Sequence, residues 1–220
     1  MVRLESPRLE MQEAPLGVSV PHPVFSWHLD SDRKGVEQNA YEIRVSPILE
    51  GLDSESSLVW NSGRVASDAM QAVYDGQALE QGTDYYTNEG ITSWSKAHRF
   101  STAIGADRWQ AEWIGEDRLS NPGENRDSLY TRLAARYLRK EFAGGQKDIR
   151  RAMLYISGLG AYEAYLNGER VSDDFLAPAL TFYSKLVYYN TYDVTRLLHK
   201  GDNTLGVILG NGRYFWLRAQ

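Results

Sequence analysis

The sequence predicts an all-β protein that contains two β-sandwich domains. Residues 1–104 hold several short stretches in which apolar and polar residues alternate, separated by turn residues and without a convincing helical period. Residues 151–171 hold two further alternating stretches that end in a tight-turn signal. A chain of 220 residues fits one large or two ordinary domains. We therefore expect a first domain at residues 1–104 and a second at residues 108–220.

Charge and composition argue against several classes of function. The 29 acidic and 24 basic residues are scattered along the chain and give a net charge of -5, which argues against nucleic acid or a membrane as partner. The chain has no cysteine, and so no disulfide, thiol nucleophile or cysteine-ligated zinc. No apolar run approaches the roughly 20 residues of a membrane span. Residues 1–16 show no signal peptide, but a processed secreted protein would look the same, so the compartment stays open.

The strands of the first domain follow from alternation. Residues 40–45 predict a strand that buries Tyr41, Ile43 and Val45 on one face. Further strands are expected at residues 24–29, before the turn at 61–63, from residue 72 onward, and within residues 92–101. Together these strands would form one sandwich.

The second domain is organised around residues 151–171. Its alternating segments predict strands, and Asn167-Gly168 supplies the two positive-φ residues of a tight hairpin turn. Asp193 is expected to cap a short turn that runs to Leu198 and ends at Gly201. Further strands are predicted at residues 137–142, 186–192 and 205–209, and irregular segments at 116–132 and 173–178.

Three sequence blocks carry a family resemblance. Residues 154–171 read Leu-Tyr-Ile-Ser-Gly-Leu-Gly-Ala-Tyr-Glu-Ala-Tyr-Leu-Asn-Gly-Glu-Arg-Val, and they are followed by Tyr-Asn-Thr-Tyr-Asp-Val-Thr (189–195) and Gly-Asp-Asn-Thr-Leu-Gly-Val-Ile-Leu-Gly-Asn-Gly-Arg-Tyr (201–214). In this order they resemble the N-terminal β-domain of bacterial α-L-rhamnosidases. The first hundred residues resemble the fibronectin type III/immunoglobulin-like domain that precedes it. The resemblance implies a galactose-binding-like jelly roll for the second domain, truncated at its C-terminus.

The resemblance also implies a function. The family's catalytic domain, an (α/α) barrel, lies further along the polypeptide and is absent from these 220 residues. We therefore expect a non-catalytic region that braces the catalytic domain of the same longer chain, an enzyme releasing terminal α-L-rhamnose from a rhamnosylated glycan or glycoside with inversion. One alternative is a calcium-dependent rhamnose- or carbohydrate-binding module. The other is a generic protein-interaction sandwich.

The residues themselves offer little for catalysis. Glycoside hydrolysis needs two carboxyl groups that face each other across the scissile bond. Asp173-Asp174 is the one tempting pair, but neighbours on an extended segment point to opposite faces. Glu163 lies on a strand face beside Tyr165 and is no better placed. We therefore expect no catalytic residue in this chain.

Carbohydrate binding is the more serious possibility. Some domains that resemble the second one bind L-rhamnose with calcium, through oxygen ligands and an aromatic platform. Calcium prefers clustered oxygen ligands, for which Asn167, Asp173 and Asp174 are candidates. The candidates for stacking on a sugar are Tyr183, Tyr188, Tyr189, Tyr214 and Trp216. The other interpretation is that tyrosines simply fill and edge a sandwich. Where many relatives carry Pro-Gly-Trp-Thr, this chain has Pro178-Ala179-Leu180-Thr181, which weakens the hypothesis of a sugar site.

One segment departs from the family's pattern. In the related enzymes the part that corresponds to residues 82–86 continues as a long central strand before a turn that resembles Asn88-Glu89-Gly90. Here Thr87 and that turn follow Tyr86 directly, as if about seven residues, or one strand, were missing. A lost central strand would expose the sheet on both sides of the gap. We expect residues omitted from the sequence rather than a true deletion, so that Tyr86 and Thr87 lie further apart than the ~3.8 Å of a trans peptide.

Overall fold

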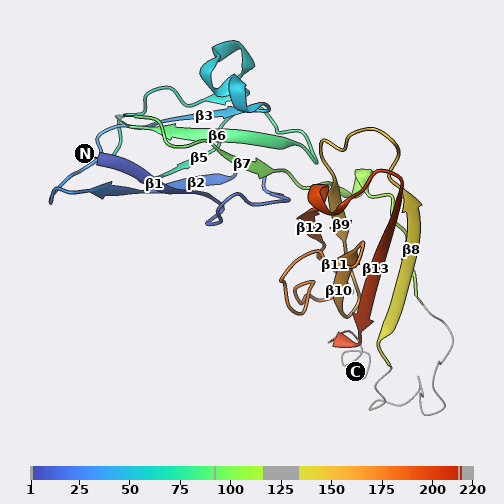
Figure 1. The fold of residues 1–220 in the computed structure, drawn as a ribbon. Coiled ribbons are helices and arrows are strands. Elements are labelled where there is room, and N and C mark those ends of the chain that lie inside the picture. Colours follow the sequence, from blue (N-terminus) through green and yellow to red (C-terminus); the bar gives the residue numbers. More distant parts are fainter. Residues whose placement is uncertain (1, 92, 116–133, 213, 215–220) are drawn as a thin grey trace. The chain divides into compact units, whose positions relative to one another are not determined.

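The computed structural model describes residues 2–91, 93–115, 134–212 and 214. The chain is all-β and divides into two compact units, Met1–Gln110 and Ala111–Gln220. Every pair of neighbouring strands is antiparallel (Figure 1), as the predicted fold class requires. In the part of the chain that the structure describes, no helix is long and apolar enough to cross a membrane.

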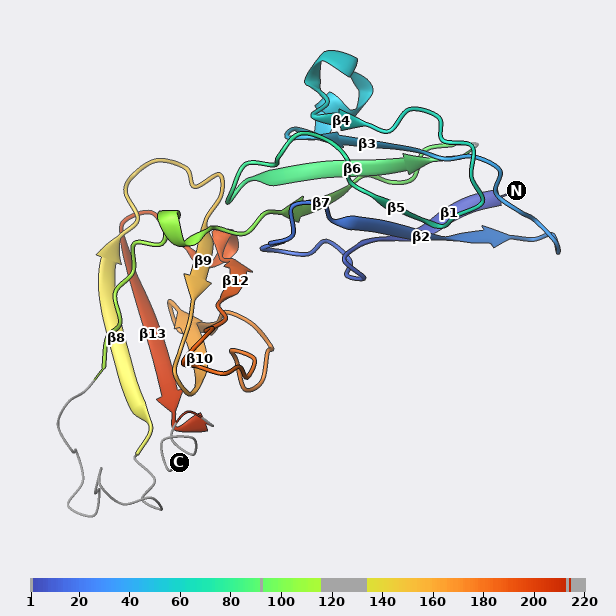
Figure 2. The ribbon, with the colours of Figure 1, turned by 180° about the vertical axis from the view of Figure 1, so that it is seen from behind.

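The first domain consists of two sheets. One sheet has the order β1-β2-β5, built from β1 (Val2–Leu9), β2 (Val24–Ser31) and β5 (Gln71–Val73). The other has the order β4-β3-β6-β7, built from β4 (Trp60–Asn61), β3 (Glu42–Ser46), β6 (Asp84–Gly90) and β7 (His98–Ser101). Figure 2 shows both sheets from behind. Three short 3-10 turns, η1 (Leu49–Asp53), η2 (Glu55–Ser57) and η3 (Ala106–Arg108), complete the domain.

One apolar core lies within the first domain. Its buried members come from both sheets and are Leu9, Phe25, Trp27, Ile43, Val45, Ala72, Tyr74, Tyr85 and Phe100. The predicted burial of Ile43 and Val45 is confirmed, and Tyr41 packs against the core as a partly buried residue. Trp27 also needs a polar partner, because a buried indole N–H must be satisfied. Its Nε1 donates to Oε1 of Gln38 over 2.8 Å.

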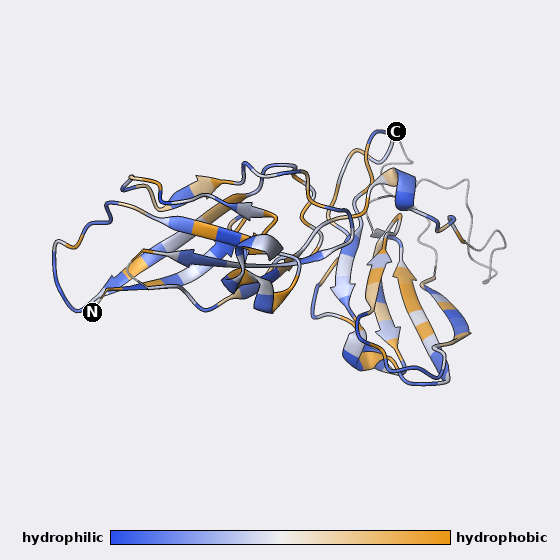
Figure 3. Ribbon diagram, turned by 90° about the horizontal axis from the view of Figure 1, so that it is seen from above, coloured by the Kyte–Doolittle hydropathy of each residue, from blue (hydrophilic) through white to orange (hydrophobic). Residues whose placement is uncertain are grey.

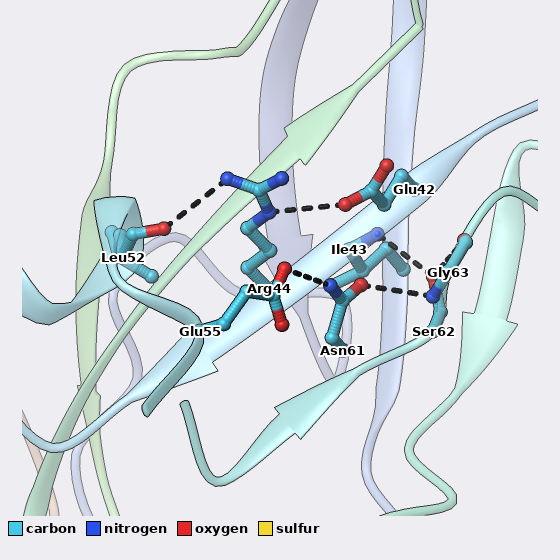
Figure 4. A network of polar contacts seen from close by, with 8 residues as sticks. All are labelled: Glu42, Ile43, Arg44, Leu52, Glu55, Asn61, Ser62 and Gly63. Atoms are coloured by element: carbon cyan, nitrogen blue, oxygen red, sulfur yellow. Dashed lines mark hydrogen bonds and ion pairs between the residues drawn. The ribbon is translucent and has the colours of Figure 1, made fainter. Parts of the chain in front are cut away.

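A polar network covers the outer surface of β3 and β4 (Figure 4). Arg44 donates to Glu42 over 3.0 Å and to the Leu52 carbonyl over 3.4 Å, and its guanidinium carbon lies 4.1 Å from the ring centre of Trp94. Asn61 of β4 donates to Glu55 over 3.0 Å. These contacts fasten η1 and η2 to the sheet.

The wide separation expected between Tyr86 and Thr87 is not found, since the two are consecutive residues of one strand, and the omission of residues from the sequence stays a prediction. β6 runs continuously from Asp84 to Gly90, with Thr87 paired to Val45 of β3 and to His98 of β7. Residues that were predicted to form a turn are drawn into the inner strand, because the backbone groups of both neighbouring strands require partners. The consequence is an unusual interior, since Thr87, Asn88 and Glu89 are all buried polar residues.

β1 was not predicted. Charged residues and Pro7 interrupt its alternation, and the register shifts between Glu5 and Arg8. Ser6 has a φ of 49° at this irregularity. A bulged edge strand of this kind carries a weak sequence signal.

The second domain contains a four-stranded sheet and a two-stranded sheet. The larger has the order β11-β10-β13-β8, built from β11 (Glu169–Arg170), β10 (Ala161–Leu166), β13 (Asp202–Gly210) and β8 (Arg136–Ala143). The smaller pairs β12 (Asn190–Asp193) with β9 (Met153–Ile156). Figure 3 colours the strands by hydropathy, and along β10 every second residue is buried, namely Tyr162, Ala164 and Leu166.

The core of the second domain lies between its two sheets. Tyr162 and Ala164 of β10 pack with Leu154 and Ile156 of β9. The predicted hairpin turn is confirmed, with φ of 53° at Asn167 and 87° at Gly168. The predicted short turn is also present, as η4 (Thr195–Leu197).

The strand expected at residues 186–192 begins only at Asn190, because residues 171–189 form a long connection without strand pairing of their own except at Ala177. The irregular segment expected at 116–132 lies outside the described residues.

Candidate functional site

The most distinctive surface of the second domain is the β11–β12 loop, residues 171–189. Connections longer than about 12–15 residues without secondary structure are uncommon and often functional. Hydrogen bonds along its length fix this loop to the sheets. Tyr162 N donates to the Ala177 carbonyl over 2.8 Å, Ser157 Oγ donates to the Tyr188 carbonyl over 2.8 Å, and Tyr192 OH donates to Asp174 Oδ2 over 2.8 Å. The loop therefore has a defined path.

A cluster of polar side chains lies under one end of the loop. Arg170 of β11 donates to the Asp174 carbonyl over 2.9 Å and to Glu163 Oε1 over 3.3 Å. Tyr165 OH donates to the other Glu163 oxygen over 2.7 Å. The cavity beside the cluster has a volume of about 10 Å³. It holds about one water molecule and leaves no room for a sugar ring.

Burial keeps two tyrosines beside this cluster, Tyr162 and Tyr192, protonated. Burial is the main cause that raises the pKa of Tyr162 above its ordinary value, and the hydrogen bond with Tyr192 adds to it. Burial likewise raises the pKa of Tyr192, which also donates to the Asp174 carboxylate. The Tyr192 hydroxyl therefore fixes the loop at Asp174, whereas the Tyr162 hydroxyl donates to the Ile156 carbonyl over 3.3 Å and to Asn190 Oδ1 over 3.1 Å.

Large apolar side chains of the loop project into solvent. Phe175 is 79% exposed, Leu176 80% and Phe182 80%. Three further residues are about half-exposed, namely Leu180, Leu186 and Tyr188. The Arg170 guanidinium carbon lies 5.1 Å from the ring centre of Phe175, which places a charge at the edge of the apolar group. Several large apolar side chains exposed on one loop make that loop a candidate interaction site.

The predicted calcium ligands are engaged in other contacts. Asn167 donates through Nδ2 to the Leu197 carbonyl over 2.7 Å and to Asn203 Oδ1 over 2.8 Å, and its Oδ1 accepts from Thr204 N over 2.9 Å. Asn167 is thus a structural hub between the hairpin and β13. Its amide would have to exchange these bonds to bind a cation.

Asp173 and Asp174 lie at the start of the β11–β12 loop. Asp174 accepts from Tyr192 and Asp173 is exposed. Among the described residues, no three histidine, aspartate or glutamate side chains come together as a metal site would need. The donor set as it stands does not fit calcium, and calcium binding stays a prediction.

The predicted stacking residues do not form one group, and two of them pack in separate ring pairs. Tyr183 packs edge-to-face on Tyr214 at 5.5 Å between ring centres, and Tyr189 packs on Tyr155 at 6.0 Å. Trp216 lies outside the described residues. The sugar platform therefore stays a prediction, while these ring pairs match the alternative in which tyrosines fill and edge the sandwich.

The exposed apolar residues of this surface follow no pattern that predicts them from the sequence. Phe175, Leu176 and Phe182 lie in a segment rich in turn residues. Apolar and polar residues do not alternate regularly there, so periodicity predicts no buried face for these side chains. The signal that could have identified them is the presence of bulky apolar residues in an irregular segment. Such residues have no strand face on which to be buried.

Both domains match known family models. Residues 4–111 match the Rha78A-like N-terminal immunoglobulin domain, and residues 147–219 match the α-L-rhamnosidase N-terminal domain. The order of the two matches is the order that the family resemblance predicted.

The proteins to which this chain is similar are also α-L-rhamnosidases. An α-L-rhamnosidase of Formosa agariphila is 34% identical over 94% of this chain, and one of Alteromonas sp. is 34% identical over 91%. The structure of an α-L-rhamnosidase from Dictyoglumus thermophilum superposes with a TM-score of 0.85 and 36% identity over 96% of this chain, which is 25% of that protein. The chain spans about a quarter of the length of the curated relatives it matches. The chain therefore belongs to the α-L-rhamnosidase family, as the region that holds its N-terminal immunoglobulin-like domain and its rhamnosidase N-terminal domain.

Proposed function

We propose that this chain is the non-catalytic N-terminal region of a longer α-L-rhamnosidase, and that it braces the catalytic domain of the same polypeptide. The observation that carries the proposal is the pair of N-terminal family matches together with the length of the relatives, of which this chain spans about a quarter.

The carboxylates of the second domain support a non-catalytic role. Glycosidases hold two carboxyl groups roughly 5–9.5 Å apart, open to the substrate from both sides. Glu163 accepts from Arg170 and Tyr165, and Asp174 accepts from Tyr192. Both carboxylates hold structure together, and the cavity between them is too small for a sugar ring.

The reaction of the longer enzyme would be hydrolysis of a terminal α-L-rhamnosyl bond with inversion. One carboxylic acid would protonate the leaving oxygen while a carboxylate on the opposite face activates a water molecule. Both groups would belong to the catalytic domain. The present chain would contribute rigid walls and a contact surface.

The test is the polypeptide that the gene encodes. We expect it to extend beyond residue 220 and to release rhamnose from an aryl α-L-rhamnoside, with the inverted anomer appearing first in time-resolved NMR. A longer polypeptide without rhamnosidase activity, or one that retains the anomeric configuration, would contradict the proposal.

A second candidate is a carbohydrate-binding module. The observation that favours it is the exposed aromatic group of the β11–β12 loop, because Phe175, Phe182 and Tyr188 present ring surface to solvent. A module of this kind would bind rhamnosylated glycan, and the predicted form of it would require calcium. Calcium-dependent retention of the chain on immobilised rhamnose, lost on chelation, is the expected result for this candidate. Equal elution with and without calcium would reject the calcium-dependent form.

A further inference from the structure

The β11–β12 loop combines exposed apolar side chains with a fixed backbone. Ala177 is buried and Pro178 is among the fully buried residues, so the centre of the loop is anchored in the domain. The exposed Phe175 and Leu176 precede this anchor in the sequence, and the exposed Phe182 follows it. Leu176 has a φ of 57°, a conformation that bulky residues rarely adopt. A surface held this firmly is preorganised for a partner.

The size of the apolar group fits a protein partner. A phenylalanine presents about 150–250 Å² of surface, so Phe175 and Phe182 alone expose on the order of 300 Å². Leu176 and the three half-exposed residues enlarge this area. The largest patch on a typical monomer is about 300–600 Å² and is often functional.

Polar groups border the apolar group. Arg170 lies against the Phe175 ring, and Asp173 and Lys185 are exposed within or beside the same loop. An apolar centre with a charged border is the usual composition of a protein interface. A lipid or detergent-like ligand would not require these bordering charges of both signs.

We propose that the β11–β12 loop is the docking surface for the remainder of the α-L-rhamnosidase polypeptide, with Phe175, Leu176 and Phe182 as its apolar contacts. This inference rests on the proposed function. The occupant is a part of the same polypeptide because relatives continue for about three times the length that this chain covers. A tethered partner is always present at high effective concentration, so a moderate apolar surface suffices.

The experiment compares hydrogen–deuterium exchange of the 220-residue chain with that of the longer polypeptide. We expect the amides of residues 179–188 to exchange at least tenfold more slowly in the longer polypeptide. Phe182→Ser should abolish that protection and should leave the thermal midpoint of the 220-residue chain unchanged. Met11→Ser is the matched control, because Met11 is 73% exposed in the first domain. It should change neither quantity.

The outcomes separate this inference from the proposed function. An active longer enzyme whose loop exchanges as fast as in the 220-residue chain would overturn the docking surface and keep the proposed function. A protected loop in a polypeptide without rhamnosidase activity would keep the docking surface and overturn the proposed function. Dimers of the 220-residue chain that Phe182→Ser dissociates would overturn the proposal in favour of a second copy. A gene that ends at residue 220 would overturn both, because no occupant would exist.

Discussion

Replacing Glu89 by glutamine is expected to stabilise the first domain at neutral pH. Glu89 is 1% exposed on β6, where it accepts a hydrogen bond of 3.0 Å from Ser95 Oγ. Its Oε1 lies 3.7 Å from Nε2 of His98. Burial raises the pKa of Glu89 to about 7, and burial lowers the pKa of His98 to about 4. Between these values both groups are neutral, so no ion pair offsets the burial.

The size of the effect follows from the pKa of Glu89. The unfolded carboxyl ionises at 4.5 and the folded one at about 7, so the folded state keeps its proton over this interval. The glutamate therefore weakens the fold progressively as the pH rises from 4.5 to 7. At about 1.4 kcal/mol per pKa unit, the loss reaches on the order of 3 kcal/mol above pH 7. Glutamine keeps an oxygen that accepts from Ser95, and because it does not ionise, it causes no loss of free energy of unfolding as the pH rises.

His98 has the opposite pH dependence. Its folded pKa of about 4 lies below the ordinary value of 6.5, so its burial weakens the fold in acid and the loss disappears as the pH rises to 6.5. This contribution is common to the parent chain and the variant. The difference in free energy of unfolding between the two proteins therefore isolates Glu89.

The assay is urea unfolding at pH 4, 6 and 8, followed by intrinsic tryptophan fluorescence, to which the buried Trp27 contributes. Glu89→Gln should match the parent chain at pH 4 and exceed its free energy of unfolding by about 3 kcal/mol at pH 8. Glu50→Gln, at an exposed position of η1, is the matched control and should change nothing with pH. A Glu89→Gln variant that is less stable than the parent chain at pH 8 would refute the argument.

Two further predictions concern the second domain. Asn167→Ala should lower its free energy of unfolding by about 2–3 kcal/mol, because it removes three hydrogen bonds and strains a left-handed residue, and Asn167→Gly should cost less. An alanine that is no worse than glycine in urea unfolding would be inconsistent with the strain. Gly160→Ala should lower the melting temperature, because the new Cβ would lie 2.3 Å from the Gly210 carbonyl oxygen and because Gly160 has a φ of 148°. Gly206→Ala is the control, since its Cβ would meet only Tyr165 Cβ, at 3.9 Å. Equal melting temperatures of these two variants would contradict the crowding at Gly160.

The sequence predicted the elements in which local pattern and tertiary packing agree. Ile43 and Val45 alternate because β3 buries one face, and Asn167-Gly168 turns because both residues adopt positive φ. β6 was not predictable in this way. Asn88-Glu89-Gly90 has the composition of a turn, and only the open edges of β3 and β7 recruit it as a strand.

The sequence predicted where the candidate site lies, but it did not predict the contacts that its residues make. Asp174 was identified for its carboxylate, whereas its role is to fix the loop through Tyr192. Asn167 was identified as a ligand and is a hub of hydrogen bonds with Leu197, Asn203 and Thr204. These partners lie at least 30 residues away in the sequence, so no local pattern reveals them. The exposure of Phe182 also follows from the path of the whole loop, which is anchored at Ala177 and Pro178, and not from its sequence neighbours.

The most direct test of the central claim is turnover by the 220-residue chain itself. Purified at high concentration and given an aryl α-L-rhamnoside, the chain should release no rhamnose above the buffer rate, because the opposed carboxyl pair that the reaction requires would lie in the catalytic domain. Turnover that survives purification and disappears in Asp173→Ala, Asp174→Ala or Glu163→Ala would place an active site in this region and contradict the bracing role.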